Sequence, residues 1–561
     1  DCFAAHPVSP ARLYRWLRGW FGKRPGGDAL EDKARKGIQI EFLGLWDTVD
    51  AFGMPIAELK PVMSWFYPMQ FSDLKLSKQV KRACHALSLD DERTTFHPIV
   101  WDQSSAQDQR RISQVWFAGV HSNVGGGYPE DQLSLVSLDW MMQHAQAAGL
   151  QLQPECVKRV SSEKSAYARI YNSRQGVAAF YRYSPRSVPQ ATSKAGAALP
   201  LIHGSVIARM TRGSDAYAPT TLPPEFLVLA PNGELLPMRG YPDATEQRAI
   251  DMAALPQSQI LDSDNADEHT AALKQAMAEL STPDRITMAP VMATIWWRRA
   301  AWIFSAFLAS LLVAFPWYGA RLHRFIERDA ASDTRSPIAS VDVARDAVVA
   351  LDALVSGFFS RLSGTFSDFI PTLVMPFIRV IGAYPVEFTV IAVAFIISLK
   401  KGEWLRGQLR DYCLLTWHPG KREPFRKSLR VLEKQKVLWW ISLVLLPDAV
   451  YLAFTVAGRA PEVRAQLAPF AVALNLCLAW RLLIYWRFER SIRDPRNPIE
   501  AAYIGQTIAR IFRTSHLMQA LSDCVRTRVV PLGFGAVLAY GAWHLLKWAA
   551  QLAGFTGTLL W

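Results

Sequence analysis

The chain has 561 residues, a formal net charge of +13 and 50% hydrophobic residues, enough for two or three domains that each bury a core. Its six cysteines are scattered singly, which argues against a zinc site or a disulfide framework, and no metal or cofactor is indicated. Twenty tryptophans accompany the basic charge, several beside apolar runs, and nucleic-acid motifs are absent. This composition favours an anionic membrane surface over nucleic acid as a partner.

The first third of the chain alternates between expected strands and helices. Residues 11–24 carry an apolar helical stripe flanked by arginines, which fits either a membrane-surface helix or a crossover helix packed on a sheet. Residues 38–46 begin in alternation and finish apolar, as a buried central strand does. We expect a helix over residues 76–89, a second apolar strand over 114–120 and a helix over 133–148. This order predicts a parallel sheet with crossover helices.

The remaining two thirds divide near residue 290. Before it the pattern is less regular, with a predicted hairpin across Phe226–Met238 that turns at Pro231-Asn232-Gly233. After it come apolar runs that we interpret as membrane spans, at residues 300–320, 384–399, 438–458, 467–486 and 529–546. The first run contains no charged residue and is long enough to cross a hydrocarbon layer of about 30 Å. Residues 370–384 form a further re-entrant or spanning candidate, and buried helices of a soluble protein are the alternative for the whole region.

The charges between the runs predict a topology. Residues 400–436 hold eleven Lys/Arg against four Asp/Glu, and residues 487–528 hold eight against four. Both segments should therefore be cytoplasmic, which with five spans also places the N-terminal part inside. A sixth span at 370–384 would reverse that side. Asp448, Arg481 and Arg379 interrupt apolar runs, which leaves a transport role open as a weaker alternative.

Two groups suited to catalysis follow predicted strands. Asp47 comes directly after the strand at 38–46, and His121 comes directly after the strand at 114–120. Functional groups collect at the carboxyl ends of strands in open α/β sheets. A carboxylate and an imidazole there could activate a hydroxyl nucleophile, with the imidazole as general base and the carboxylate fixing its tautomer. Each residue alone also has an ordinary structural interpretation, as a turn cap or a core histidine.

Three ordered segments carry a family resemblance: Gly44–Val49; His85–Leu87 with Asp91–Arg93 and Phe96; and Val115–Tyr128. They resemble the α/β-hydrolase family of phospholipase effectors that the bacterial type VI secretion system delivers. The resemblance covers roughly residues 36–145. It implies Asp47 as the catalytic acid and His121 as the base, with the nucleophilic serine of a Gly-Phe-Ser-Arg-Gly elbow earlier in the chain.

The sequence departs from this family in several places. It contains no Gly-x-Ser-x-Gly, and in the first 35 residues the single serine, Ser9, lies between Val8 and Pro10. We therefore expect the serine upstream of residue 1, and an inactive fragment without it. Asn123 stands where relatives usually carry Asp, and Asp50 where Gly is common. His85 is the rival base, although a structural hydrogen bond and an Arg93–carboxylate pair are the favoured interpretation. Gly125–Gly127 lacks the Lys-Ser/Thr of a phosphate-binding loop and is interpreted as a turn.

The sequence thus predicts a partial α/β-hydrolase followed by an α-helical transmembrane region. We expect the C-terminal part of a hydrolase domain at residues 1–150, a cap or linker at 151–292 and about five spans at 293–561. The leading hypothesis is an effector phospholipase that hydrolyses bilayer phospholipid in a target cell. Its expected partners are the bilayer, a secretion-system component and an immunity protein. The main alternative is a catalytically inactive membrane protein whose hydrolase-like domain binds a partner.

Overall fold

The computed structural model describes residues 38–49, 74–212, 217–238, 266–283, 285–331, 380–418 and 504–524, together with residue 420, scattered positions between 427 and 490, and residue 543. The chain forms two compact units. The first contains Asp1–Val291 and Gln408–Gly420, and the second contains Met292–Gly407 and Lys421–Trp561. The stretch at 11–24, most of the third to fifth expected spans, Arg379 and Asp50 lie outside the described residues.

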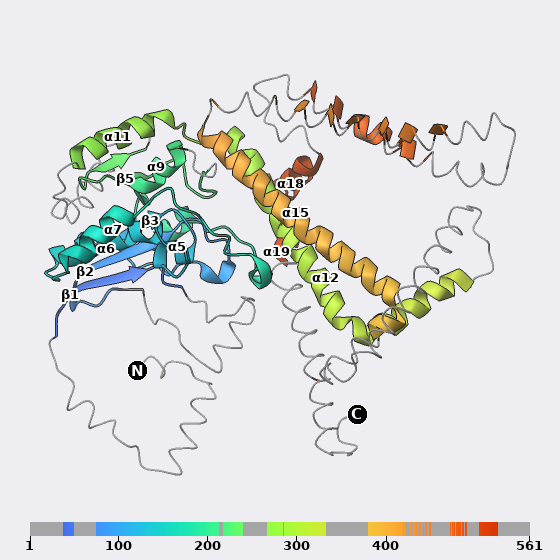
Figure 1. Cartoon of the computed structure of the whole chain (residues 1–561), viewed down its shortest axis with the longest axis horizontal. Coiled ribbons are helices and arrows are strands. Elements are labelled where there is room, and N and C mark those ends of the chain that lie inside the picture. Colours follow the sequence, from blue (N-terminus) through green and yellow to red (C-terminus); the bar gives the residue numbers. More distant parts are fainter. Residues whose placement is uncertain are drawn as a thin grey trace, which may run out of the picture. The chain divides into compact units, whose positions relative to one another are not determined.

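The first unit is built on a six-stranded sheet in the order β1-β2-β3-β4-β5-β6. Neighbouring strands from β1 to β5 are parallel, and β5 and β6 pair antiparallel as the expected hairpin. Figure 1 shows β1, β2 and β3 side by side, as their pairing requires. The strands are β1 (Ile40–Trp46), β2 (Val80–Ser88), β3 (Ile112–Phe117), β4 (Leu201–His203), β5 (Leu227–Leu229) and β6 (Leu235–Pro237).

Helices of this unit follow or connect the strands. They are η2 (Thr94–Phe96), α4 (Ala106–Arg111), α5 (His121–Gly125), α6 (Ser134–Ala147), α7 (Pro154–Glu163), η3 (Gly176–Phe180), α8 (Val188–Lys194), α9 (Gly204–Arg212) and α11 (Ala266–Glu279). The expected α/β fold with a parallel sheet is therefore confirmed. Strands β4 to β6 come from beyond residue 150 and continue the same sheet, while the predicted division into three domains remains a prediction.

One element of the sequence interpretation is wrong. Residues 76–89 were expected to be helical, but Val80–Ser88 form β2, which pairs with β1 on one side and β3 on the other. Apart from Lys81 and Arg82 at its start, β2 is buried along its whole length. A parallel strand covered on both faces loses the polar alternation that marks a half-exposed strand. Its spacing of apolar residues therefore resembled that of a helix.

The core of this unit lies between the sheet and α6. Side chains of β2 and β3, including Cys84, Val115 and Phe117, pack with Val136, Trp140 and Met141. Gly44 of β1 permits a close approach there, because a Cβ atom at this position would lie 2.7 Å from Sδ of Met141. This close packing brings the backbone of β1 directly against α6.

The second unit contains the long helix α12 (Arg285–Ala331, beginning in the first unit) and most of α15 (Pro385–Trp417), with α18 (Ile504–Thr514) and α19 (His516–Cys524). Helices α12 and α15 run side by side (Figure 1). The hydroxyls of Ser305 and Ser398 form a hydrogen bond, and Nδ1 of His323 lies 2.7 Å from Oε1 of Glu387. Because the residue numbers rise in one helix as they fall in the other, the two helices are antiparallel.

The expectation of five spans is supported only in part. Within the described residues, one helix is long and apolar enough to cross a membrane, namely the Met288–Arg324 part of α12, which contains the expected span at 300–320. The expected span at 384–399 is helical but continues into Lys400 and Lys401 as part of α15. The last residues of α15 belong to the first unit, where the ring of Trp417 is buried against Phe226.

Candidate active site

The carboxyl ends of β1, β2 and β3 meet at one edge of the sheet because the three strands are parallel. Asp47 follows β1 and is fully buried, and its φ of 44° is the only positive value at a non-glycine residue within the described part of the chain. Its Oδ1 accepts a hydrogen bond from the backbone N–H of Ser88, at the end of β2, at 2.9 Å. The turn after β1 thus aims the carboxylate across the end of β2.

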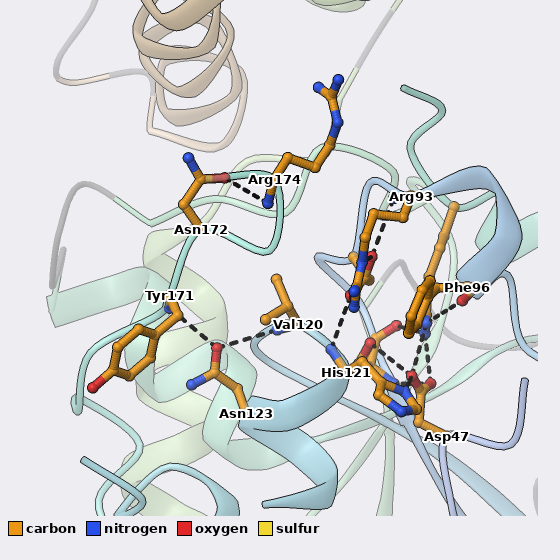
Figure 2. A network of polar contacts seen from close by, with 12 residues as sticks. Asp47, Arg93, Phe96, Val120, His121, Asn123, Tyr171, Asn172 and Arg174 are labelled. Atoms are coloured by element: carbon orange, nitrogen blue, oxygen red, sulfur yellow. Dashed lines mark hydrogen bonds and ion pairs between the residues drawn. The ribbon is translucent and has the colours of Figure 1, made fainter. Parts of the chain in front are cut away.

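His121 begins α5, directly after the turn that follows β3. Its Nδ1 lies 2.7 Å from Oδ2 of Asp47, and its side chain is 30% exposed. An ionised carboxylate only accepts hydrogen bonds, so Nδ1 is the donor, and in the neutral ring Nε2 is then the proton acceptor. The structure therefore brings together the two groups that the sequence placed at separate strand ends (Figure 2).

Arg186 is a third member of this cluster, and the sequence interpretation missed it. Its Nη1 and Nη2 lie 2.5 and 2.7 Å from Oδ1 and Oδ2 of Asp47, and both side chains are buried. The guanidinium also donates to the backbone carbonyls of Ser88 and Phe96. Burial alone would raise the pKa of Asp47, but the charge of Arg186, with hydrogen bonds from Arg186 and His121, lowers it well below its ordinary value. Asp47 is therefore ionised at neutral pH.

Two adjacent aspartates after β2 hold the backbone that carries His121. Oδ2 of Asp90 accepts from the N–H of Gly119 at 2.6 Å, and Oδ2 of Asp91 accepts from the N–H of His121 at 3.2 Å. Gly119 has a φ of 108°, which a residue with a side chain rarely adopts, and a Cβ there would lie 2.5 Å from Cβ of Asn123. The position of the imidazole is thus set by β2 as well as by β3.

Phe96 borders the imidazole, and Arg93 packs on the ring of Phe96 (Figure 2). The ring of Phe96 meets that of His121 edge to face at a centroid distance of 5.3 Å, and the guanidinium carbon of Arg93 lies 3.3 Å from the Phe96 ring centroid. Arg93 also forms a bidentate ion pair with Asp91, at 3.0 and 2.7 Å. The Asp91–Arg93 and Phe96 positions that contributed to the family resemblance therefore support His121, Phe96 through its ring and Asp91 through the backbone N–H.

The rival base, His85, lies inside the sheet on β2 with 1% of its surface exposed. Its Nε2 accepts from the N–H of Thr48 at 3.0 Å, so Nδ1 carries the proton and lies 3.4 Å from Oε1 of Gln114. Burial lowers the pKa of His85 to about 4. A neutral ring with both nitrogens engaged and no access to solvent is suited to a structural role.

Asn123 fastens a distant loop to α5. Its Oδ1 accepts from the N–H groups of Tyr171 and Val120 at 3.2 and 3.4 Å (Figure 2). Its Nδ2 donates to the carbonyl of Arg169 at 3.1 Å. A carboxylate could not make the last of these bonds. Asn123 forms no hydrogen bond with the imidazole of His121 among the contacts of the described residues. Helix α5 ends at Gly125, and the next two glycines have positive φ values, as a turn there requires.

Residues 24–144 match a family model described as "T6SS, Phospholipase effector Tle1-like, catalytic domain". This segment belongs to the type VI secretion system phospholipase effectors. It contains Asp47, His121 and the two aspartates, Asp90 and Asp91, that bind the backbone before α5. Arg186 lies beyond the match. No curated protein and no solved structure matches the chain. The effector segment implies a hydrolase delivered to target cells.

The described residues offer no obvious metal centre. No group of three or more His, Cys, Asp or Glu side chains within them lies close enough together to hold a metal ion. At the edge of the sheet where Asp47 and His121 meet, the carboxylates of Asp47 and Asp91 are instead paired with the guanidinium groups of Arg186 and Arg93.

Proposed function

We propose that the complete protein is a serine esterase that hydrolyses phospholipid in membranes, with Asp47 as the orienting acid and His121 as the general base. The observation that carries this proposal is the 2.7 Å hydrogen bond between Nδ1 of His121 and Oδ2 of Asp47. This bond holds the ring in the tautomer whose Nε2 accepts a proton. The effector family of residues 24–144 supplies the substrate class.

The chemistry follows from the state of these groups. Nε2 of His121 takes the hydroxyl proton of a serine as its oxygen attacks the acyl carbonyl, and the imidazolium then returns that proton to the departing alcohol. Water, deprotonated by the same nitrogen, releases the fatty acid from the acyl-enzyme. Asp47 stays ionised throughout, since the charge of Arg186 opposes its protonation, and it stabilises the transient imidazolium.

The serine is assigned to sequence that precedes residue 1. None of the 561 residues forms a Gly-x-Ser-x-Gly elbow, and α/β-hydrolases place their residues in the chain order serine, acid, histidine. The sheet supports this assignment, because β1 is an edge strand of the described sheet, and Ile40 at its start and Ile38 just before it are exposed by 41% and 54%. An open apolar edge is normally covered or paired. A further parallel strand beside β1 would carry an elbow to the sheet end where His121 lies.

Comparing two lengths of the protein tests this proposal. The 561-residue chain and a form extended by the coding sequence upstream of Asp1 would be incubated with phosphatidylglycerol/phosphatidylethanolamine vesicles, and released fatty acid measured. We expect release by the extended form alone, abolished by replacing its elbow serine with alanine or by His121→Ala. Equal release by both lengths, or full activity of a folded His121→Ala variant, would contradict the assignment.

We further propose that the second unit anchors the enzyme in a bilayer as a multi-pass protein, with the hydrolase unit on the cytoplasmic side. In the pair formed by α12 and α15, the polar side chains of Ser305 and Ser398 face each other, while Phe307 and Ile397 are 56% and 62% exposed. Apolar side chains directed outward and paired polar groups directed inward are the arrangement that lipid requires. Asn475 and Asp448, from two further apolar runs, also form a hydrogen bond at 3.0 Å, at an exposed position.

Vesicle flotation checks the anchor. We expect wild-type protein to float with the vesicles and to resist extraction by alkaline carbonate. Ile397→Asp places a charge on the outward face and should lower the Tm of the vesicle-bound protein, whereas Ile397→Leu should not. Wild-type protein that fails to float, or that alkaline carbonate extracts, would contradict the proposal. Delivery by the secretion system and neutralisation by an immunity protein are part of the same proposal, based on the family of residues 24–144.

The alternative function is a catalytically inactive membrane protein whose hydrolase-like unit binds a partner. The observation that favours it is the missing elbow in the 561 residues. The upstream coding sequence separates the two, because an in-frame start codon without an elbow serine leaves the dyad without a nucleophile.

A further inference from the structure

We propose that Arg186 is a positioning residue of the Asp47–His121 dyad, which holds the carboxylate so that Oδ2 faces the imidazole. The positioning of Asp47 is inferred from the geometry of the described residues. The effect expected on kcat rests in addition on the proposed function. Arg186 lies outside the segment that matches the effector family, and it is 139 residues away from Asp47 in the chain.

The contacts of the Asp47 carboxylate show how its orientation is held. Oδ2 of Asp47 receives Nη2 of Arg186 and Nδ1 of His121, each at 2.7 Å, while Oδ1 receives Nη1 of Arg186 at 2.5 Å. A planar fork that engages both oxygens fixes the plane of the carboxylate, which a single point charge does not. Ser88 also donates to the carboxylate, from its N–H to Oδ1 at 2.9 Å and from its hydroxyl to Oδ2 at 3.3 Å. The guanidinium makes the shorter contact to each oxygen, so we assign to it the larger part in directing Oδ2 toward the imidazole.

The other contacts of Arg186 include the residue whose ring borders the imidazole. Its guanidinium donates to the carbonyl of Phe96, and the Phe96 side chain packs edge to face on His121. It also donates to the carbonyl of Ser88, whose N–H binds Asp47. One buried cation thus joins the acid, the end of β2 and the residue that borders the imidazole.

The segment around Arg186 is itself anchored. The N–H of Ser184 donates to the carbonyl of Glu92 at 2.8 Å, and the hydroxyl of Ser187 caps α8 by accepting from the N–H of Gln190. Tyr183 and Val188, on either side, are buried. The backbone at 186 therefore gives the guanidinium a defined starting point, as a positioning role requires.

Three variants distinguish positioning from a purely structural role. Arg186→Lys keeps a cation beside Asp47 but removes the fork. Arg186→Met removes the charge and leaves a buried carboxylate without its partner. Arg186→Met combined with Asp47→Asn removes both charges, and since losing both partners of a buried pair is tolerated better than losing one, it should recover much of the Tm that Arg186→Met loses.

The first measurement uses the 561-residue chain and requires no turnover. A proton held between Nδ1 of a histidine and a buried carboxylate gives a low-field proton NMR resonance, which is assigned here by its loss in His121→Ala. We expect this resonance in wild type, a shifted or broadened resonance in folded Arg186→Lys, and none in the double variant. An unchanged resonance in Arg186→Lys would overturn the proposal, whatever happens to its Tm.

The second measurement uses the extended form of the protein. Because displacing a catalytic group slows the reaction without weakening substrate binding, Arg186→Lys should lower kcat by about tenfold to a hundredfold and leave KM unchanged. Unchanged kcat with a lower Tm would show that Arg186 is structural only. If wild type releases no fatty acid but the resonance responds to Arg186→Lys as expected, the hydrolase function fails while the positioning of Asp47 stands.

Discussion

The backbone N–H of Thr48 donates a hydrogen bond to Nε2 of His85, so the residue directly after Asp47 is held by a histidine from the middle of the sheet. Protonation of His85 would replace this acceptor with a second donor, and burial of the ring already opposes the charge. The pKa of about 4 caused by burial couples the fold of the site to pH.

The first prediction concerns stability in acid. The unfolded chain protonates His85 near its ordinary pKa of 6.5, while the folded chain does so only near 4. As the pH falls from 6.5 to 4, wild type should therefore lose up to about 3 kcal/mol of unfolding free energy relative to His85→Gln, which does not titrate. Urea unfolding at a series of pH values measures this difference. A difference that stays constant over that range would show that His85 is not held neutral.

The second prediction separates the two histidines. His85→Ala removes a buried ring and its acceptor, and should cost about 2 to 4 kcal/mol of stability while leaving turnover per folded molecule in place. His121→Ala changes a partly exposed ring, so the extended protein should remain folded and lose turnover. Parallel unfolding and fatty-acid release assays on both variants check this. Loss of turnover in a folded His85→Ala protein, with activity retained in His121→Ala, would exchange their roles.

A third prediction concerns Asn123. Its Nδ2 donates to the carbonyl of Arg169, and Asn123→Asp would set a carboxylate oxygen against that carbonyl. We expect a loss of about 1 to 3 kcal/mol at neutral pH, reduced in acid, where the carboxyl group becomes a donor again. Asn123→Ala is the control, since it loses the bonds without adding charge. Equal stability of Asn123→Asp and wild type would mean that the loop at 169–171 is held by other contacts.

The fourth prediction has the opposite sign from that for His85. Burial raises the pKa of Asp90 from 3.8 to about 6, although hydrogen bonds from Gly119 and Tyr217 oppose this. The folded state therefore binds the proton more tightly, and its stability falls as the pH rises from about 4 to about 6. Relative to Asp90→Asn, wild type should lose about 1 to 3 kcal/mol across this window. The same unfolding series applies, and a difference that does not change with pH would contradict it.

Much of the fold followed from local patterns. The strands that end near Asp47 and His121, the helix over 133–148 and the hairpin at 226–238 were all signalled by apolar runs with turn residues at their ends. The strand β2 was not, because burial on both faces removes the alternation that identifies a strand. The position of His85 at its centre shows the consequence, since a residue expected on a helix lies inside the sheet.

The sequence likewise predicted part of the candidate site. Asp47 and His121 each follow a strand directly, so the parallel arrangement alone brings them to one edge. Arg186 gave no comparable signal, because it follows no predicted strand and lies 139 residues away from Asp47 in the chain. Asp91 was noted only as part of the family resemblance. The sequence did not predict that Asp90 and Asp91 bind the backbone N–H groups of Gly119 and His121.

The left-handed backbone at Asp47 limits which amino acids the position accepts. Gly and Asn adopt a φ near 44° readily but offer the guanidinium no negative charge. Glu supplies the charge, but its side chain is longer by one methylene group and it adopts a positive φ less readily than Asp. Among the twenty genetically encoded residues, aspartate alone combines a negative charge with tolerance of this backbone conformation. Saturation mutagenesis of position 47 followed by selection for function should therefore recover only aspartate.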